Sequence, residues 1–455
     1  MKPRSITLLL VVLVACTGQR PTVTSMPVIT IPPTTTTTAG PLVVEVAGCG
    51  APPVNFALLC EVVETIDENH LTPPAHASLA AAAAGGISLF TSTESPDLPA
   101  TLTCAIPSAD FTILCDAIEA RLNSDPVPLA PLVEAAVDQM LTEVLDPYTR
   151  YIPPELTGAF GDNGVIYGSG IVIGARTVAG SPCARIGPTC PLLIELVIDG
   201  SPGETAGLVI GDQITAVDGS DVSDLTVLEV AGKLTKATGE ASDLTILRSG
   251  EEMAVELVHQ LEGLMPVTSQ MVGNVGYIRL AEFGFDTHLF VHFGLQVLLE
   301  QGADRLVLDL RDNPGGYLFS VSIIGSEFFV DGLLYKTRSP TENLDFPAVE
   351  GGIATRVPIT VLVNESSASS AEILTAVLSE RNRALVVGQP TYGKNVVQDA
   401  FEMRNGGILR VTTSEWTTPG GATVAGVGVQ PDIELDLGPE LTVEQVIAAV
   451  LAASR

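Results

Sequence analysis

The chain has 455 residues and a formal net charge of −31, with 22 Lys and Arg against 53 Asp and Glu. This excess of acidic residues argues against nucleic-acid binding, which needs Lys and Arg to neutralise phosphates, and against broad adhesion to an anionic membrane surface. Apolar residues make up 46% of the chain, so most of it is globular, with length for roughly two to four domains.

The N-terminus has the features of an export signal. Lys2 and Arg4 precede the apolar stretch ITLLLVVLVA at 6–15, which is shorter than the ~20 residues that a bilayer span needs. The stretch ends in Ala15-Cys16, and small residues before a cysteine resemble a bacterial lipoprotein signal. We therefore predict a signal peptide at 1–15, lipidation of Cys16 and an exported, membrane-anchored protein at the cell surface or in the periplasm. An ordinary secretory signal with an incidental cysteine is the alternative.

A tether and an internal repeat follow. Residues 16–41 are rich in Thr and Pro, a composition that forms no core and favours an extended tether. CGAPPVNFALLCEVVE at 49–64 and CAIPSADFTILCDAIE at 104–119 then share Cys, Pro, Phe, Leu and Cys at identical offsets. Each copy leads into an apolar stretch that we expect to be helical, and Gly85-Gly86 is expected to end the first of these helices. We predict two helical copies, at 42–103 and 104–158.

The cysteine pattern favours disulfides. Of the seven cysteines, those other than Cys16 form an even set, which is typical of disulfides in exported chains. They can pair in many ways, but their spacing favours three local bonds: Cys49–Cys60, Cys104–Cys115 and Cys183–Cys190. No Cys-x-x-Cys motif occurs, so we expect no zinc site, and we predict neither a metal nor another cofactor.

The remaining chain changes from β signals to alternating β and α signals. The segment 194–225 predicts a strand, a short helix capped near Ser201 and a second strand, and 243–259 predicts a hairpin with its turn at Ser249-Gly250. From 263 onward, buried strands alternate with helices, as in a layered α/β domain. The strands are predicted at 275–280, 305–311, 358–364 and 384–388, and the helices at 286–301 and 372–380.

A serine cluster and a lysine are the candidates for chemistry. NESSASSAEIL at 364–374 contains four serines, and a serine hydroxyl needs a base to become a good nucleophile. None of the five histidines lies where strands of the α/β domain lead into loops, the usual place for ligands. Lys394, in GQPTYGKNVVQ at 388–398, could be the base of a Ser–Lys pair if burial lowers its pKa from ~10.4 to roughly 7–8. Taken alone, however, a lysine at such a position is usually an exposed loop cation.

Several motifs together resemble the carboxyl-terminal processing (tail-specific) serine protease family. They are VNESSASSAEIL, GQPTYGKNVVQ, LVLDLRDNPGG at 306–316, GVGVQPDIEL at 426–435, LDPYTRYIPPEL at 145–156 and GSPGETAGLVIGDQITAVDG at 200–219. The resemblance implies an α/β (α+β) multidomain fold with N-terminal helical segments. In this fold a PDZ-like, β-rich domain, at 159–262, is inserted before a layered, ClpP/crotonase-like α/β serine protease core at 263–455.

The resemblance also implies roles for individual residues. Ser369 lies three residues before Glu372 and 25 before Lys394, which is the spacing of the family's nucleophile, and Gln398 corresponds to the glutamine that orients the lysine. The amide of Ser370, with that of Gly315 or Gly316, would bind the oxyanion. Four positions depart from the residues usual in the family, namely Ser366, Ser370, Ala371 and Asn395.

The PDZ resemblance implies recognition of protein tails. PDZ domains bind a peptide as an added strand and capture its terminal carboxylate with backbone amides; here Gly168, Ser169, Gly170 and Ile171 would form that loop. The predicted function is an exported, lipid-anchored serine endopeptidase for protein or peptide substrates with free apolar C-termini. We expect membrane contact only through the lipid and no nucleic-acid partner, and make no prediction of oligomeric state. The alternative is a catalytically impaired PDZ-containing lipoprotein that acts as a peptide-binding scaffold. A hydrolase of another substrate class is disfavoured, because the chain lacks the G-x-S-x-G motif.

Overall fold

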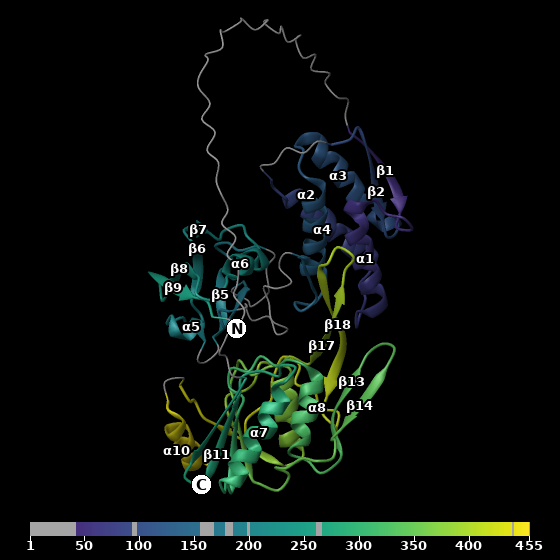
Figure 1. Ribbon diagram of the computed structural model, residues 1–455. Coiled ribbons are helices and arrows are strands. Elements are labelled where there is room, and N and C mark those ends of the chain that lie inside the picture. The colour runs from purple at the N-terminus through teal and green to yellow at the C-terminus, as the bar shows by residue number, and fades with distance from the viewer. Residues whose placement is uncertain are drawn as a thin grey trace, which may run out of the picture. The chain divides into compact units, whose positions relative to one another are not determined.

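The computed structural model describes residues 42–92, 98–154, 168–177, 185–197, 201–260, 266–438 and 441–454 (Figure 1). The chain divides into two units, residues 1–41 and 42–455, and the first lies wholly outside the described residues. The predicted signal peptide, tether and Cys16 therefore fall outside the described part, as does Cys183 of the third predicted disulfide. No helix in the described ranges combines the length and the apolar character that crossing a bilayer requires.

The helical part of the chain contains two related copies. Its elements are β1 (Val43–Gly48), α1 (Val54–Asn69), α2 (His76–Leu89), β2 (Thr101–Ile106), the 3-10 helix η1 (Ala109–Phe111), α3 (Thr112–Ser124) and α4 (Leu129–Val144). Each copy begins with a short strand that the sequence reasoning missed, and β1 pairs with β2 in parallel. Cys49–Cys60 and Cys104–Cys115 each join the strand region of one copy to the helix that follows, and these are the two pairings predicted within the copies. The helices share one apolar core.

The alanine-rich helix α2 packs closely against α4. A side chain at Gly86 would meet the carbonyl oxygen of Ala135 at 2.6 Å, so glycine allows the two backbones to approach. The helix continues through Gly85-Gly86 to Leu89, so the expectation that this pair ends it is wrong. Burial against α4 outweighs the low helix propensity of two glycines, which is roughly 1 kcal/mol each.

The region predicted to be PDZ-like is a small antiparallel sheet with two helices. Its elements are β4 (Ile171–Ala175), β5 (Leu192–Val197), α5 (Pro202–Thr205), β6 (Gln213–Val217), β7 (Ser220–Asp221), α6 (Val227–Leu234), β8 (Ala241–Arg248) and β9 (Glu251–Val258). The strand order is β4-β5-β6-β8-β9, with β7 beside β6, so β4 is an edge strand. The predicted turn at Ser249-Gly250 joins β8 to β9, and both its residues have positive φ, as tight hairpin turns require.

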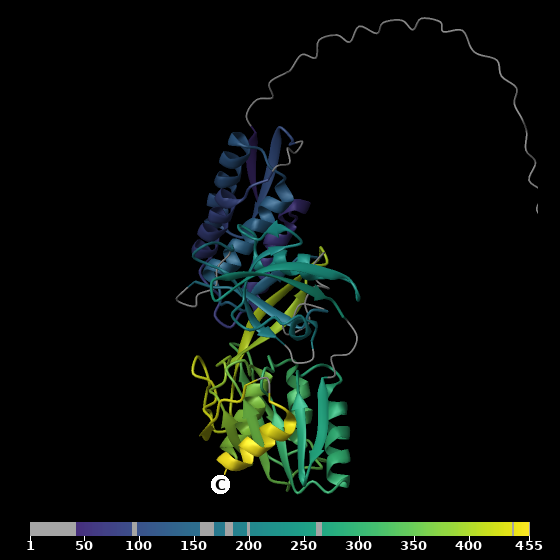
Figure 2. The same cartoon turned by 90° about the vertical axis from the view of Figure 1, so that its left-hand side faces the viewer.

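The C-terminal region contains a six-stranded, mostly parallel sheet. Its elements are β10 (Val267–Val272), β11 (Val275–Leu280), α7 (Thr287–Glu300), β12 (Arg305–Asp309), α8 (Leu318–Ser326), β15 (Ile359–Val363), α9 (Ser370–Glu380), β16 (Ala384–Gly388), β19 (Ile433–Glu434) and α10 (Val443–Ala453). The order is β10-β11-β12-β15-β16-β19. Alternate side chains of these strands pack on α7, α8 and α9 on one face and on α10 on the other, and Figures 1 and 2 show α7 and α10 on opposite sides. Layers on both faces explain why these strands read as continuous apolar runs.

A second sheet joins the segment that follows the helical part to strands of the C-terminal region. It comprises β3 (Arg150–Ile152), β13 (Leu333–Arg338), β14 (Asn343–Pro347), β17 (Val396–Glu402) and β18 (Ile408–Thr417). The order is β14-β13-β18-β17, and β3 also pairs with β18. Because β3 directly follows the helical part, the segment before the PDZ-like region is bound by backbone hydrogen bonds to the C-terminal region.

Candidate active site

Three loops meet at one edge of the six-stranded sheet. β12, β15 and β16 are adjacent and parallel, so their carboxyl ends lie side by side. The first is followed by Gly315 and Gly316, the second by Ser369 and the third by Lys394. The crevice beyond the carboxyl ends of parallel strands is where ligands bind in α/β sheets.

Three of the four clustered serines, Ser367, Ser369 and Ser370, differ clearly in their surroundings. Ser367 is fully buried, and its Oγ donates to the carbonyl oxygen of Leu310 at 2.7 Å. Ser370 is also buried and donates to the carbonyl oxygen of Gly316 at 2.8 Å. Ser369 is half-buried and precedes α9 with φ of 54°, a conformation that costs a non-glycine residue roughly 1–3 kcal/mol and is typical of functional sites. Ser369 is thus the serine that the backbone presents at the mouth of the helix.

The glycine loop packs directly on this turn. A side chain at Gly315 would lie 2.8 Å from Cβ of Ser369, and one at Gly316 would lie 2.3 Å from the carbonyl oxygen of Phe283. Both glycines have positive φ, 101° and 141°. No larger residue than glycine fits between Phe283, which follows β11, and the turn at Ser369. The backbone itself therefore forms this wall of the site.

Two backbone amides beside Ser369 remain available. The amide of Gly315 donates to Oδ1 of Asn313 at 2.9 Å. One of the two glycine amides predicted to bind the oxyanion therefore already has a hydrogen-bond partner. The amides of Gly316 and Ser370 have no hydrogen-bond partner among the described residues. The first amides of a helix lack intrahelical partners and suit a developing negative charge.

Lys394 contacts a nearby amide and an aromatic ring from a distant part of the chain. Its Nζ donates to Oε1 of Gln398 at 2.9 Å and lies 4.6 Å from the ring centroid of Tyr148. Burial, reinforced by the positive charges of Arg150 and Arg410, lowers the pKa of Lys394 to about 8. A lysine with this pKa is neutral in about a tenth of the molecules at pH 7 and in about half at pH 8, so it can accept a proton.

The carboxylate of Glu372 joins the serine turn to the lysine loop. One oxygen accepts from the amides of Ser369 and Lys394, both at 2.8 Å. The other accepts from Oγ1 of Thr391 and the amide of Gly393, both at 2.6 Å. Burial raises the pKa of Glu372, and these four donors oppose the rise. No hydrogen bond joins Ser369 Oγ to Lys394 Nζ in the described structure, but such bonds often tighten only when substrate binds.

The lysine loop also packs on the GVGVQP motif. A side chain at Gly428 would lie 2.0 Å from the carbonyl oxygen of Thr391, and Thr391 Oγ1 accepts from the amide of Val429 at 2.7 Å. The φ of Asn395 is not positive, so this position needs no glycine. The departure from the family pattern at Asn395 is therefore sterically compatible with the loop.

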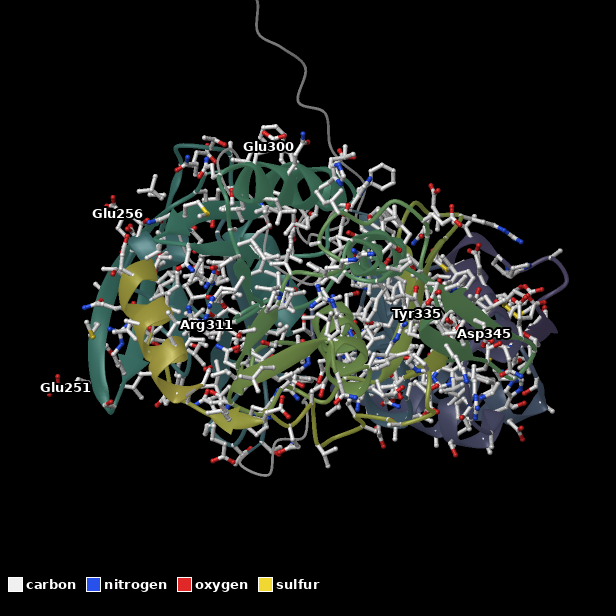
Figure 3. The ribbon with its side chains drawn as sticks, turned by 90° about the horizontal axis from the view of Figure 1, so that it is seen from below. Glu251, Glu256, Glu300, Arg311, Tyr335 and Asp345 are labelled. Carbon is white, nitrogen blue, oxygen red and sulfur yellow. A yellow bond between two sulfur atoms is a disulfide. The ribbon has the colours of Figure 1, made fainter. Side chains whose placement is uncertain are left out.

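A buried ion pair lies beneath the glycine loop. Asp309 is fully buried, and its Oδ2 accepts from Arg311 at 2.6 Å and from the Tyr277 hydroxyl at 2.7 Å. Burial alone would raise the pKa of Asp309, but the guanidinium of Arg311, labelled in Figure 3, holds it below its usual value. The pair fixes the chain just before the glycines, a role that the sequence reasoning did not assign to LVLDLRDNPGG.

The four residues predicted for carboxylate capture form one tight loop before β4. Gly168 and Gly170 have φ of 76° and 69°, and a side chain at Gly170 would lie 2.2 Å from Cβ of Ser201. Ser169 is fully buried, and its Oγ accepts from the amide of Ile171 at 3.2 Å. The loop opens an edge strand, and β4 and α6 contribute to one apolar cluster.

Comparison with known proteins decides the family. The pattern of peptidase family S41 matches residues 274–435, and that of the PDZ domain matches residues 193–248. A carboxyl-terminal-processing protease of Synechocystis sp. is 34% identical over 307 residues, which cover 65% of this chain and 69% of that protein. The chain belongs to peptidase family S41. It is a serine peptidase of the carboxyl-terminal-processing type with a PDZ domain, as the sequence motifs predicted.

Two further relatives agree. Carboxyl-terminal-processing peptidase 2, chloroplastic, of Arabidopsis thaliana is 32% identical, with 69% of this chain and 62% of that protein covered. The solved structure of the photosystem II D1 C-terminal processing protease has a TM-score of 0.64 at 22% identity and covers 89% of this chain and 98% of its own. The predicted fold class is thus confirmed. The S41 and PDZ matches lie inside the predicted ranges 263–455 and 159–262, whose boundaries remain predictions.

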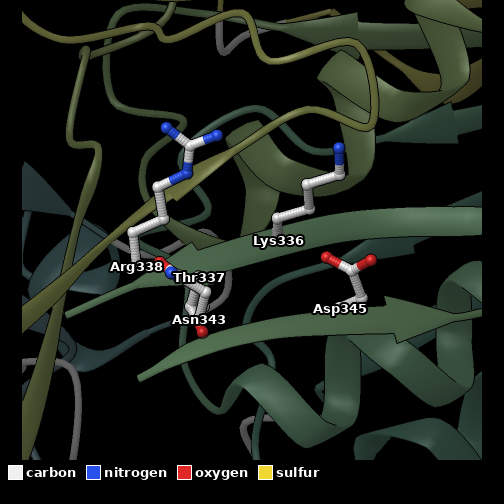
Figure 4. A pocket seen from close by; sticks show the side chains of 5 residues that line it. All are labelled: Lys336, Thr337, Arg338, Asn343 and Asp345. Carbon is white, nitrogen blue, oxygen red and sulfur yellow. The ribbon is translucent and has the colours of Figure 1, made fainter. Parts of the chain in front are cut away.

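The S41 peptidase has another polar pocket. It has a volume of about 290 Å³ and is lined by the β13 and β14 side chains labelled in Figure 4, which are Lys336, Thr337, Arg338, Asn343 and Asp345. Lys336 and Asp345 are direct partners across the two strands. None of the predicted site residues lines this pocket, so it is not the candidate active site.

The pH dependence of the S41 peptidase is the first prediction. Replacing Gln398 by Glu puts an anion beside the ammonium of Lys394, which favours the charged form and raises its pKa. The rate of peptide hydrolysis should rise with pH through a midpoint near 8 in the wild type. In Gln398→Glu that midpoint should rise by about one unit or more. The pH profile of kcat/KM measures the shift.

Asp399→Asn is the matched control. Asp399 is the next residue on β17, is exposed and accepts from Thr413 Oγ1 rather than from Lys394. This control should keep the wild-type midpoint. If Gln398→Glu and wild type have the same midpoint, the rise of kcat/KM with pH does not report the deprotonation of Lys394.

Proposed function

We propose that this S41 peptidase is an exported, lipid-anchored endopeptidase that cleaves proteins with a Ser369–Lys394 dyad. The observation that carries the dyad is the carboxylate of Glu372, one oxygen of which accepts from the amides of both residues. Ser369 is half-buried and has a strained backbone with positive φ, and Lys394 has a lowered pKa of about 8. A nucleophile and a base presented from adjacent strand ends are the parts that acyl transfer requires.

The proposed reaction proceeds through an acyl-enzyme. Ser369 Oγ attacks the scissile carbonyl carbon while neutral Lys394 takes the hydroxyl proton. The amides of Gly316 and Ser370 donate to the oxyanion of the tetrahedral intermediate. The lysine ammonium then gives its proton to the leaving amine. A water molecule, deprotonated by Lys394, attacks the ester, and the released proton returns to Ser369 Oγ as the carboxylic product leaves. Gln398 holds the lysine throughout.

The PDZ domain is proposed to deliver substrate tails. β4 is an edge strand that can accept a peptide as an additional strand, and the Gly168–Ile171 loop at its start would bind the terminal carboxylate. The apolar cluster shared by β4 and α6 favours an apolar last side chain. A scaffold without catalysis is the weaker alternative, because Ser369, Lys394 and Gln398 are all present.

The dyad makes a direct prediction. Ser369→Ala and Lys394→Ala should each lower turnover by about a thousandfold or more, since nucleophile and base act as a unit. Lys394→Arg should be equally inactive because arginine stays protonated. Binding of a tail peptide to the PDZ domain should stay at wild-type affinity in all three. Single-turnover cleavage of an unfolded protein and peptide-binding titrations measure the two functions.

Ser367→Ala tests the assignment among the serines. It removes a buried hydroxyl that bonds Leu310, so it should lower stability by about 1 kcal/mol and leave the chemistry running. An active Ser369→Ala together with an inactive Ser367→Ala would mean that the nucleophile has been assigned to the wrong serine.

Tail recognition predicts a preference between matched substrates. A protein with a free, apolar C-terminus should be cleaved faster than the same protein with an amidated or charged C-terminus, because only the first offers both a carboxylate and an apolar side chain. Initial rates at substrate concentrations below KM measure the preference. Equal rates for both tails would rule out carboxylate capture as the delivery step.

The proposed anchor rests on the sequence Leu13-Val14-Ala15-Cys16 and on the Thr/Pro-rich tether that follows. Cys16→Ser should move the protein out of the membrane fraction or block its maturation, because the thiol would carry the lipid. Membrane fractionation measures the release, and intact-mass measurement detects the block in maturation. Thr17→Ser is the control. Wild-type fractionation and mass of Cys16→Ser would exclude the lipid anchor.

A further inference from the structure

The segment between the helical part and the PDZ domain touches the proposed base. Tyr148 precedes β3, and its ring centroid is 4.6 Å from Nζ of Lys394. Its carbonyl oxygen accepts a hydrogen bond from Nε2 of Gln398. Because the amide nitrogen of Gln398 is committed to Tyr148, the amide oxygen is the group that faces the ammonium, and it accepts from Nζ at 2.9 Å.

We propose that Tyr148 is a positioning residue for Lys394: its carbonyl orients the Gln398 amide, and its ring shields the lysine nitrogen from water. This inference rests on the proposed Ser–Lys function and extends it to a residue that lies 246 positions before the lysine. No catalytic step passes through the Tyr148 side chain. Its role is to fix the direction and the surroundings of Nζ.

The position of Tyr148 is set by Asp146. The Asp146 carboxylate accepts from the amides of Tyr148 and Thr149 at 2.9 and 3.1 Å and from the Thr149 and Thr412 hydroxyls at 2.7 and 2.8 Å. Burial alone would raise the pKa of Asp146, but these donors and His70 lower it to about 2. Asp146 thus stays ionised throughout the working pH range and keeps the turn closed.

The helical part supports the same turn. His70, at the end of α1, places Nε2 3.0 Å from Oδ2 of Asp146, while its Nδ1 accepts from the amide of Thr72. The Nε2 atom therefore carries the proton and donates to Asp146. The amide of Leu71 donates to the carbonyl oxygen of Thr412 on β18. The first helical copy is thereby connected to Lys394 through Asp146, Tyr148 and Gln398.

Two effects of the Tyr148 ring on Lys394 oppose each other. An aromatic face attracts an ammonium and favours the charged form, by roughly 0.5–2 kcal/mol. The same ring excludes water from Nζ and disfavours the charged form. Burial is the largest cause of the lowered pKa of Lys394, so we expect loss of the shield to dominate when the ring is removed.

The other charges around Lys394 stay in place when the ring is changed. Arg150 on β3 and Arg410 on β18 disfavour the ammonium, whereas Asp146 and Glu372 favour it. Removing the Tyr148 ring alters none of these four side chains. A shift in the pH profile then reports the shielding of Nζ rather than a change in the surrounding charge.

The test compares two substitutions of Tyr148 in the full-length protein. Tyr148→Ala removes the ring, and the midpoint of the kcat/KM pH profile should rise by about one unit, which is about a tenfold loss of rate well below the midpoint. Tyr148→Phe keeps the ring and should keep the wild-type midpoint. If Tyr148→Ala does not fold, Tyr148→Leu should show a smaller rise in the same direction.

Tyr151→Ala is the matched control. Tyr151 lies on β3, is buried, and its hydroxyl accepts from Nδ2 of Asn405 rather than touching Lys394. This substitution should lower the unfolding temperature and leave the midpoint unchanged. Tail-peptide affinity of the PDZ domain should be the same in all variants.

The outcomes separate this inference from the proposed function. A midpoint in folded Tyr148→Ala that is unchanged or lower than in wild type overturns the shielding role while the dyad stands. An equal rise in Tyr151→Ala would also overturn it, because the shift would then follow general loosening of the segment. Full activity of Lys394→Ala would instead refute the proposed dyad itself.

Discussion

The carboxylate of Glu372 is the constraint on which the rest of the site depends. It is buried at the start of α9, and its four hydrogen-bond donors replace the water that an ionised group would otherwise bind. Leaving a buried acceptor without its hydrogen-bond donors costs roughly 1–3 kcal/mol, and more for a charged group, so the serine turn and the lysine loop are held together by the need to satisfy this one group. Neither loop is set by its own sequence alone.

Burial raises the pKa of Glu372 and lowers the pKa of Lys394, so it favours the neutral form of both groups. Glu372 keeps backbone and hydroxyl donors close to both oxygens, whereas Lys394 has a single side-chain acceptor, Gln398, and two arginines nearby. Burial still raises the pKa of Glu372, but four donors oppose it, whereas the ammonium of Lys394 has one hydrogen-bond acceptor and its pKa falls to about 8. This asymmetry suits a carboxylate that holds two loops together and a lysine whose neutral form is favoured.

Much of the fold could be predicted from the sequence because its signals are local. Buried strands appeared as apolar runs, the β8–β9 turn as Ser249-Gly250, and the repeat as two sets of cysteines with one spacing. The choice of Ser369 rests on its distances to Glu372 and Lys394 counted along the chain, and it remains a prediction. The strands β1 and β2 were missed, because a short apolar run has no periodicity that distinguishes a strand from a helix unless the strand it pairs with is known.

The supporting residues could not be predicted, because their contacts are not local. Tyr148 and Gln398 are 250 positions apart, and only the pairing of β3 with β18 brings them together. Asp146 lies in the motif LDPYTRYIPPEL and His70 is one of five histidines, and the sequence alone assigned neither of them a role. The engagement of the Gly315 amide by Asn313 likewise depends on the fold of the loop, so the sequence left both glycines open as oxyanion donors.

The chain order explains why a helical segment takes part in a site made by the C-terminal region. β3 precedes the PDZ domain and pairs with β18, while β10 follows it and belongs to the neighbouring six-stranded sheet. The PDZ domain is thus an insertion between two segments, one of which contributes β3 to the second sheet and the other β10 to the six-stranded sheet. A core that began at β10 would lack Asp146, Tyr148 and Arg150. Lys394 would then lose the Tyr148 ring above its Nζ and the charge of Arg150, which destabilises its protonated form. The surroundings of Lys394 therefore combine a segment before the PDZ domain with the region after it.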